Sequence, residues 1–268
     1  MTHPIFNRPR PVIIGHRGAA GSAPENTLAS FQQALEEGAQ ILESDIHVTS
    51  DGFPILLHDS TVDRTTNGTG EAHQLSLSEI QALDASANFS AASGVQAQTS
   101  FESPVRIPTL REAFEAFPNA AFNLEIKGNS EALVKSVVSL AQEMKREDQT
   151  LLTAGEDKIQ ALLREERART GAKSALGASL ADILEVIRSA QEHRPPETDS
   201  MAIQVPSEFG GRPLITQELV DHCHQHQIEV HVWTINDAQE MRDLLDLGVD
   251  GLVTDVPARM AHLLAQRR

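Results

Sequence analysis

The sequence predicts an α/β fold, a (β/α)8 TIM barrel, on three observations. The chain has 268 residues, which suits a single barrel of this kind, since such barrels commonly run to about 250 residues. Short β-branched runs alternate with helical patterns over most of the chain, which favours parallel strands joined by crossover helices. Hydrophobic residues make up 40% and charged residues 22% of the sequence, as in ordinary globular proteins. We therefore expect residues 1–268 to form one barrel domain.

The expected elements alternate in order along the chain. Strands are predicted at the short apolar runs, at about 12–14, 41–47, 53–57, 121–126, 150–153, 174–178, 201–205, 229–233 and 251–254. Helices are predicted between them, at roughly 26–37, 109–116, 131–146, 156–169, 180–191, 216–226, 237–246 and 257–265. This makes one strand candidate more than an eight-stranded barrel requires, so one candidate should have another role.

The extra strand is explained by a hairpin at the second strand. In HVTSDGFPILLHD, Asp51-Gly52 lies between two apolar runs, and this dipeptide is preferred in two-residue type I′ hairpins. The run 53–57 is thus predicted to return antiparallel to 41–47. In that register Ser50 faces Phe53, and Asp45 faces His58, so the turn would bring an acid and a histidine to the same height.

The least regular stretch is residues 60–107, which is rich in Gly, Ser, Ala and Thr. A loop of this length in a compact domain is usually functional or an insertion. We expect an insertion that forms a cap over the strand ends. No repeat of fixed period and no linker divides the chain.

Charge and cysteine content limit the possible partners. The formal charge of −16 would repel nucleic acid, although a metal or a few local cations would still allow a small phosphate ester to bind. The single cysteine, Cys223, cannot form an intramolecular disulfide. The N-terminus lacks the apolar core of a signal peptide, and no apolar run approaches the ~20 residues of a membrane span. We expect a cytoplasmic protein, a monomer or a homodimer.

Three acids stand at the ends of predicted strands. Glu43 and Asp45 are two residues apart in ILESDIHV, so both side chains point to one face of the strand. Glu125 and Lys127 repeat this spacing in FNLEIKG. Carboxylates on an inward face favour a hard cation with oxygen ligands, such as Mg²⁺ or Ca²⁺. The alternative is that each acid lies at a solvated strand end and pairs with a nearby Lys or Arg.

Two histidines and two cations complete the set of candidate residues. His16 and His58 each follow a strand, and imidazole suits proton transfer at neutral pH. Asp59, beside His58, is expected to orient either the His58 ring or another loop. Arg17 and Lys127 are suitable counter-charges for a phosphate. In IIGHRGAAGS the glycines at 15, 18 and 21 would let the backbone approach a ligand closely. Together these residues suggest a phosphoryl group held beside a proton-transfer residue.

These motifs resemble those of the glycerophosphodiester phosphodiesterase family. The matching segments are GHRGAAGSAPENTLASF, ESDIHVTSDGFPILLHDSTVDRTTNGTG, IPTLREAF, NLEIKG and VHVWTINDAQEMRDLLDLGVDGLVTDVP. They cover residues 12 to about 128 and about 200 to 257, and residues 130–200 match only loosely.

The resemblance implies a (β/α)8 barrel with its site at the carboxyl ends of the strands. It implies one divalent cation, Mg²⁺ or Ca²⁺ with Mn²⁺ possible. The residues that match the family's functional positions are Glu43, Asp45 and Glu125 as metal ligands, His16 and His58 as catalytic residues, Arg17 and Lys127 as phosphate contacts, and Gln204 and Trp233 in the substrate pocket. The segment LLTAGEDKIQ lacks a Ser-Phe pair that is often seen in relatives, so pocket contacts from that strand are in doubt.

The implied reaction is hydrolysis of a glycerophosphodiester to sn-glycerol 3-phosphate and an alcohol, through a cyclic phosphate. One alternative is a lysophospholipase D, which would need an exposed apolar rim for an acyl chain. Because residues 85–107 are mostly small and polar, the soluble substrate is preferred. A non-catalytic phosphodiester-binding barrel is a second alternative, but it would lack at least one of these histidines or acids.

A competing cluster in DHCHQHQ places His222, Cys223, His224 and His226 close together in sequence. Only His222 and His226 share a helical face, at i and i+4. A solvated helix is therefore expected there in preference to a metal site.

Overall fold

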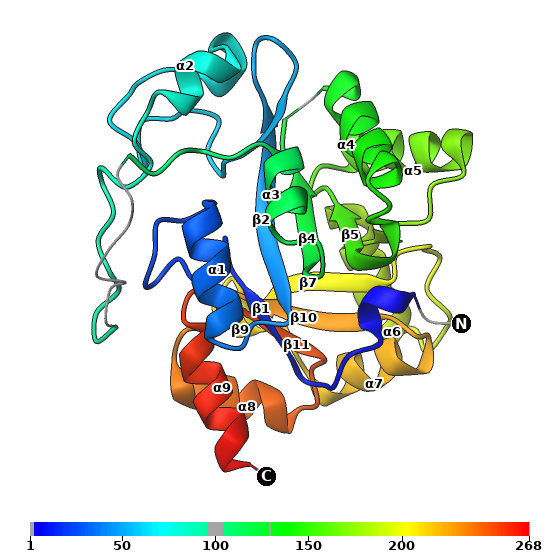
Figure 1. Cartoon of the computed structure of the whole chain (residues 1–268). Helices are drawn as coiled ribbons and strands as arrows, with labels where there is room; N and C mark the ends of the chain where they lie inside the picture. The colour runs from blue at the N-terminus through cyan, green and yellow to red at the C-terminus, as the bar shows by residue number, and fades with distance from the viewer. Residues whose placement is uncertain (1–2, 96–103, 129, 268) are drawn as a thin grey trace.

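The computed structural model describes residues 3–95, 104–128 and 130–267 (Figure 1). Within this part of the chain, parallel strands form a nearly closed barrel, as the sequence predicts. Around the barrel they are β6 (Ala175–Leu176), β5 (Thr150–Thr153), β4 (Ala121–Ile126), β2 (Ile41–Val48), β1 (Val12–Gly15), β11 (Gly251–Thr254), β10 (Glu229–Trp233) and β7 (Ala202–Pro206). A parallel bridge between Gly177 and Ala202 brings the first and last of these together.

Helices connect the strands and cover the outside of the barrel. They are α1 (Leu28–Glu36), α3 (Leu110–Ala116), α4 (Glu131–Glu143), α5 (Asp157–Thr170), α6 (Leu180–Gln191), α7 (Gln217–Gln225), α8 (Ala238–Asp246) and α9 (Pro257–Gln266). Several begin at a Ser or Thr whose side chain accepts a hydrogen bond from the backbone N–H three residues later, which stabilises the first turn. These caps are Thr27, Thr109, Ser130, Ser179 and Thr216. No helix in the described ranges is long and apolar enough to cross a membrane.

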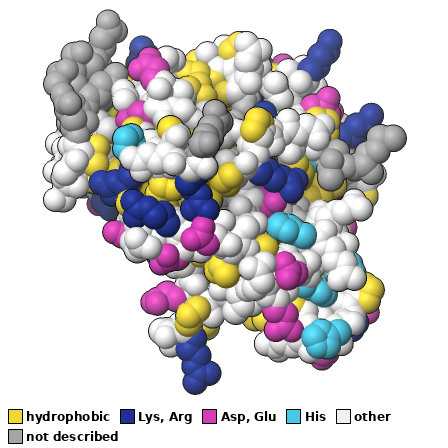
Figure 2. Space-filling model, turned by 90° about the horizontal axis from the view of Figure 1, so that it is seen from below, with side chains coloured by type: hydrophobic (Ala, Val, Ile, Leu, Met, Phe, Trp, Pro, Cys, Tyr) yellow, Lys and Arg dark blue, Asp and Glu magenta, His cyan; other side chains and the backbone are white. Residues whose placement is uncertain are grey.

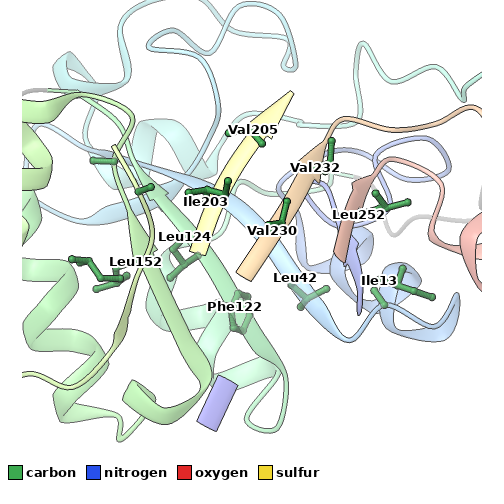
Figure 3. Packing of buried hydrophobic residues seen from close by; sticks show 14 of the residues in the cluster. Ile13, Leu42, Phe122, Leu124, Leu152, Ile203, Val205, Val230, Val232 and Leu252 are labelled. Atoms are coloured by element: carbon green, nitrogen blue, oxygen red, sulfur yellow. The ribbon is translucent and has the colours of Figure 1, made fainter. Parts of the chain in front are cut away.

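Alternate residues along each strand form two apolar layers. The outer layer packs beneath the helices and includes Ile13, Leu42, Phe122 and Leu252, which Figure 3 shows on neighbouring strands. The inner layer is built from residues near the strand starts, which are Val12, Ile41, Ala121, Leu151, Ala175 and Ala202. Ile5 and Phe6 of the short 3₁₀ helix η1 (Pro4–Phe6) pack against this inner layer. They fill the amino end of the barrel, so the carboxyl end is left to carry a site.

The hairpin at strand 2 is present, but its predicted register is wrong by one residue. Strand β3 (Pro54–Leu56) pairs antiparallel with β2, with Ile46 opposite Leu56. The Leu57 N–H donates to the Asp45 carbonyl at 3.0 Å, so Asp45 lies opposite Leu57 and not opposite His58.

The length of the turn explains the shift. The Thr49 N–H donates to the Phe53 carbonyl at 3.0 Å, which leaves a three-residue loop, 50–52. Gly52 has φ of +89°, the left-handed conformation that such a loop requires at its last position. The Thr49 hydroxyl donates to the Asp51 carboxylate at 2.6 Å and accepts from the Phe53 N–H at 2.9 Å, which stabilises the longer loop.

The described part of the insertion lies beside this hairpin, at the end of β2 (Figure 1). It contains the 3₁₀ helix η2 (Ala72–Gln74) and a short helix α2 (Leu77–Gln81) that the sequence analysis did not predict. It has its own small core, formed by Ile55, Leu57, Val62, Ala72, Ile80, Ala85, Val105 and Ile107. Residues 96–103 of the predicted insertion lie outside the described ranges. The Ala92 N–H donates to the Gly21 carbonyl at 2.9 Å, which connects the insertion to the loop after β1.

A second short hairpin, also not predicted, follows β7. It consists of β8 (Glu208–Phe209) and β9 (Arg212–Pro213), joined by Gly210 and Gly211. The 3₁₀ helix η3 (Glu147–Gln149) precedes β5. On the face of the molecule seen in Figure 2, acidic side chains lie beside the basic ones, so the charges on that face are locally compensated.

Candidate active site

A pocket of about 430 Å³ opens at the carboxyl ends of the strands. It is lined by all nine residues predicted as metal ligands, catalytic residues, phosphate contacts or pocket residues, which are His16, Arg17, Glu43, Asp45, His58, Glu125, Lys127, Gln204 and Trp233. They come from β1, β2, the segment after β3, β4, β7 and β10. Residues more than 200 positions apart in sequence therefore meet in one pocket, although their individual roles remain predictions.

The acids of the pocket are paired with its cations. The Lys127 ammonium lies 2.8 Å from Glu125 Oε2 and 3.3 Å from Asp45 Oδ1. The guanidinium Nε of Arg17 lies 3.5 Å from Asp45 Oδ2. The Arg17 backbone N–H donates to Glu43 Oε2 at 2.8 Å. Lys127 thus stands between two of the three predicted metal ligands.

The donor chemistry of the three acids fits a hard cation. Burial, together with the negative charge of Asp45, raises the pKa of Glu43 to about 7, so the carboxylate form is disfavoured unless positive charge is added. Oxygen donors of this kind are those that Mg²⁺ and Ca²⁺ prefer. No group of three or more acidic, His or Cys side chains in the described ranges surrounds a common metal position. The positive charge between Asp45 and Glu125 is the Lys127 ammonium.

His16 is held by a carboxylate just after the last strand, β11. Its Nδ1 lies 2.6 Å from Asp255 Oδ1, and Asp255 Oδ2 accepts a 2.6 Å hydrogen bond from the Asn236 amide. Burial lowers the pKa of His16, but the hydrogen bond to Asp255 and the negative charges of Glu43 and Asp255 outweigh it, so the net pKa is raised. The sequence analysis missed Asp255 and Asn236, and the only available signal was their position just after strands, in TDVP and TIND.

His58 is held in a similar way by its neighbour. Its Nδ1 lies 2.6 Å from Asp59 Oδ1, which is the contact that the adjacency of the two residues suggested. Arg64 of the insertion donates from Nε to Asp59 Oδ2 at 2.7 Å. Hydrogen bonds from Arg64 outweigh partial burial and lower the pKa of Asp59 below its usual range. Asp59 is therefore ionised when it contacts the imidazole.

Arg64 also connects the His58 side of the pocket to Arg17. It donates two hydrogen bonds of 2.8 Å to the carboxylate of Glu25, and Arg17 donates to the same carboxylate at 2.8 Å. Neither Glu25 nor Arg64 was predicted from the sequence. The signal for Arg64 was its place in the irregular segment DRTTNGTG, which alone does not specify partners.

The glycines after β1 have a different role from the predicted one. A Cβ on Gly18, whose φ is +88°, would lie 2.3 Å from the Ser30 hydroxyl oxygen. A Cβ on Gly21 would lie 2.8 Å from the Asp255 carbonyl oxygen. Neither glycine lines the pocket. The prediction that they permit close approach to a ligand is therefore corrected, because they permit the loop to pack against α1 and the segment after β11.

Strand β5 and its neighbours add contacts that the sequence analysis left open or missed. Thr153 and Gly155 line the pocket in the segment that lacks the Ser-Phe pair. Asn123, two residues before Glu125 on β4, also lines it, and its buried Oδ1 has no hydrogen-bond partner among the described residues. Its position on the same strand face as Glu125 was the signal that could have identified it.

The histidine-rich helix α7 directs its side chains to separate partners. His222 Nε2 lies 2.8 Å from the Ser189 hydroxyl, and His224 Nε2 lies 3.0 Å from Asp250 Oδ2. Cys223 is buried in the outer core. The rings of His222 and His226, which share the helical face, lie 4.7 Å apart between their centroids.

Fold and site together define a barrel hydrolase whose pocket combines two histidines, acids and cations, a set that suits phosphoric esters. The model of the glycerophosphoryl diester phosphodiesterase family matches residues 16–259. The chain therefore belongs to this family, whose members are phosphoric diester hydrolases.

Individual relatives agree with this assignment. A glycerophosphodiester phosphodiesterase of Caldanaerobacter subterraneus is 30% identical over 262 residues, which are 94% of this chain and 97% of that protein. A human lysophospholipase D is 28% identical over 270 residues, 94% of this chain and 85% of that protein. The solved structure of an Oleispira antarctica phosphodiesterase in complex with the product sn-glycerol-3-phosphate has a TM-score of 0.74 and 24% identity, over 95% of this chain and 97% of that one. At 24% identity, the similarity of the two structures shows that the two proteins share a fold and shows nothing more.

Proposed function

We propose that the protein hydrolyses glycerophosphodiesters to sn-glycerol 3-phosphate and an alcohol by two-histidine general acid–base catalysis. One observation carries the proposal. His16 and His58 line the same pocket, and each has its Nδ1 within 2.6 Å of its own carboxylate. A carboxylate at Nδ1 fixes the ring and its tautomer, which leaves Nε2 to exchange a proton with the substrate.

The cations and acids of the pocket would bind the phosphodiester between these histidines. Arg17, fixed by Glu25 at 2.8 Å, offers guanidinium donors to the non-bridging oxygens, and Lys127 offers an ammonium. Glu43, Asp45 and Glu125 would hold a divalent cation. When bound, that cation would neutralise phosphate charge and lower the pKa of the nucleophile. Lys127, displaced from the carboxylates, would then be available to the phosphate.

The nucleophile in this proposal is the 2-hydroxyl of the substrate's own glycerol. One histidine accepts the proton of this hydroxyl as its oxygen attacks phosphorus. The other donates a proton to the leaving alcohol, and water then opens the cyclic phosphate. An internal nucleophile benefits from effective molarities that can reach ~10⁵ M or more.

A substrate analogue tests the internal attack. A phosphodiester whose glycerol lacks the 2-hydroxyl is expected to be turned over at least about 10²-fold more slowly than the natural diester, because attack would then depend on external water. Release of the alcohol from both compounds is the measurement. Comparable rates for the two compounds would exclude the cyclic intermediate while leaving the hydrolase assignment intact.

The reaction class is tested by a coupled assay for glycerol 3-phosphate on a panel of diesters that differ in headgroup. We expect the untreated enzyme to form glycerol 3-phosphate and the chelated enzyme to form none. Activity should return when Mg²⁺, Ca²⁺ or Mn²⁺ is added back to the chelated enzyme. Turnover that continues at full rate in excess chelator would remove the cation from the proposal.

Replacing Arg64 tests the connection between the two sides of the pocket. In Arg64→Met the carboxylates of Asp59 and Glu25 lose the hydrogen-bond donor that they share. The side chains that these carboxylates hold, His58 and Arg17, therefore become less well fixed. We expect kcat/KM to fall by about 10- to 100-fold, since small misplacements of reacting groups are costly, and Arg64→Lys should recover part of the loss. Arg111→Met is a matched control because Arg111 is also 47% exposed and pairs with an acid, Glu143, away from the pocket. Wild-type kcat/KM in Arg64→Met would contradict the role.

A further inference from the structure

The carboxylate that holds His16 is itself held by an asparagine from a neighbouring segment. Asn236 follows β10 and Asp255 follows β11, and these two strands pair in parallel. The Asn236 amide donates to Asp255 Oδ2 at 2.6 Å, while Asp255 Oδ1 lies 2.6 Å from His16 Nδ1. The two oxygens of this carboxylate therefore have different partners, an amide on one side and an imidazole on the other. His16 lines the pocket, whereas Asn236 and Asp255 lie behind it.

The orientation of the Asn236 amide is fixed by its own partners. Its Oδ1 accepts hydrogen bonds from the Asp255 backbone N–H at 2.9 Å and from the Thr254 hydroxyl at 3.0 Å. A backbone N–H can only donate, and a carboxylate can only accept. If the amide were rotated by half a turn, its NH₂ group would face the Asp255 N–H and its oxygen would face the Asp255 carboxylate. Only the observed orientation satisfies both groups, so Asn236 presents a donor to the carboxylate.

The backbones of His16 and Asp255 are also fixed by contacts that do not involve Asn236. The His16 N–H donates to the Thr254 carbonyl at 2.9 Å, and the Asp255 carbonyl accepts from the Gly21 N–H at 2.8 Å. Among the described residues, the Asn236 amide is the one hydrogen-bond partner of Asp255 Oδ2. Removing this amide would therefore leave the two backbones in place and free the Asp255 carboxylate to rotate.

Charge gives the Asn236 contact its importance. Burial raises the pKa of Asp255, but the hydrogen bond and positive charge of His16, the hydrogen bond from Asn236 and the charge of Arg17 outweigh it, so the net pKa is lowered. Asp255 is therefore ionised at neutral pH. A partly buried carboxylate oxygen that loses its donor is unfavourable, so it would turn toward water and take Oδ1 away from the His16 ring.

We infer that Asn236 is a positioning residue of the reaction, which orients the His16 ring by fixing the carboxylate of Asp255. The inference rests on the proposed function, in which His16 exchanges a proton with the substrate at Nε2. A ring held at Nδ1 keeps Nε2 directed into the pocket, and small misplacements of a reacting group are costly. Asn236 thus has the same task for the His16 carboxylate that Arg64 has for the carboxylate beside His58.

Two substitutions at position 236 test the inference. Asn236→Leu removes the amide with little change in size. Asn236→Asp keeps an oxygen that can accept from the Thr254 hydroxyl and the Asp255 N–H, but it sets a second carboxylate against Asp255, and like charges at this distance repel. At about pH 8, where both carboxylates are ionised, each variant should lower kcat on glycerophosphocholine by about tenfold or more. Because Asn236 does not line the pocket, KM should stay within about twofold of the wild-type value.

A second measurement follows the His16 ring directly and requires no turnover. A hydrogen bond to a carboxylate moves the proton resonance of an imidazole N–H downfield, so the Nδ1–H of His16 can be observed by NMR in protein made with isotope-labelled histidine. His16→Ala would assign this resonance by its disappearance. In both Asn236 variants the resonance should move upfield or broaden beyond detection, because the carboxylate no longer holds the ring.

Asp237→Ala is the matched control, since it changes the next residue of the same segment. The Asp237 carboxylate accepts from the Gln239 and Glu240 N–H groups at 2.8 and 2.9 Å and so caps α8, and Asp237 does not line the pocket. Its replacement should lower the melting temperature, because the helix loses its cap, and should leave kcat and the His16 resonance unchanged. The control therefore separates destabilisation of this segment from loss of the Asp255 contact.

Variants of Thr254 test the same contact if those at position 236 fail to fold. Thr254→Val keeps the shape of the side chain and removes one of the two hydrogen bonds that fix Asn236 Oδ1. It should lower kcat by about twofold or more and move the His16 resonance in the same direction as the Asn236 variants. Thr254→Ser keeps the hydroxyl and should retain wild-type kcat.

The possible failures are distinguishable. Wild-type kcat in folded Asn236→Leu and Asn236→Asp would overturn the inference and leave the proposed function in place. A fall in kcat with an unchanged His16 resonance, or a rise in KM at constant kcat, would also overturn it, since Asn236 would then act by another route. A wild-type enzyme that formed no glycerol 3-phosphate would overturn the proposed function, and an unchanged His16 resonance in the variants would separately overturn the positioning of the ring.

Discussion

Replacing either pocket histidine with alanine is expected to lower kcat by about 10²- to 10⁴-fold, the range typical of a general acid or base. His16 and His58 each have Nδ1 engaged by a carboxylate at 2.6 Å, so alanine removes a proton-transfer group whose ring is already fixed. Steady-state kinetics on glycerophosphocholine would measure the loss. Because both histidines act in the same displacement step, one as acid and one as base, the double variant should lose less than the product of the two single losses.

The control for this prediction is His73→Ala. His73 is an exposed histidine of the insertion, with a side chain 62% exposed, and it does not line the pocket. Its replacement should leave kcat unchanged. Circular dichroism and the melting temperature would verify that each variant folds. If His16→Ala or His58→Ala folded normally and kept more than about a tenth of wild-type kcat, that histidine would not be a proton-transfer residue.

The second large effect is expected from Glu43→Ala, which should abolish both cation binding and turnover. Glu43 is buried, and its pKa is raised to about 7 by burial and by the charge of Asp45. A bound cation stabilises the carboxylate form, so the residue and the ion should depend on one another. A loss of kcat on the order of 10³-fold or more is expected, since a catalytic cation contributes several kcal/mol. Calorimetric titration with Mn²⁺ would measure binding independently of activity.

Glu43→Gln and Glu166→Gln refine this prediction. Glu43→Gln keeps an oxygen that can accept the 2.8 Å hydrogen bond from the Arg17 N–H, but it removes the charge, so it should also lose cation affinity. Glu166 is a similarly buried acid on α5 that pairs with Arg169 at 2.6 Å, away from the pocket, and its replacement should affect neither property. A Glu43→Ala enzyme with wild-type Mn²⁺ affinity would remove this residue from the ligand set.

Much of the fold could be predicted because it follows from local patterns. Short apolar runs indicated the barrel strands, and the helical patterns between them indicated the helices. The hairpin register could not be predicted, since the same Asp51-Gly52 sequence is compatible with two loop lengths. Only the hydrogen bonds of Thr49 in the folded turn select the three-residue loop. A shift of one residue was enough to move His58 out of register with Asp45.

The sequence predicted which residues meet in the candidate site because the carboxyl ends of the barrel strands converge. The spacing of Glu43 and Asp45, and of Glu125 and Lys127, placed side chains on one face of a strand, and barrel geometry then brought the faces together. The side chains that hold the site residues in place could not be predicted. Asp255 reaches His16 across 239 positions, and Arg64 reaches Glu25 across 39, and no local pattern specifies contacts at such separations.

The sequence by itself predicted the barrel, the kind of chemistry and seven of the pocket residues, because periodicity and residue type act over short distances along the chain. The family resemblance added Gln204 and Trp233. Tertiary structure alone decided which carboxylate holds each histidine and that Lys127 stands between Asp45 and Glu125. These contacts depend on the order of strands around the barrel. That order is set when the whole chain buries its apolar surface, and it is not encoded in any one segment.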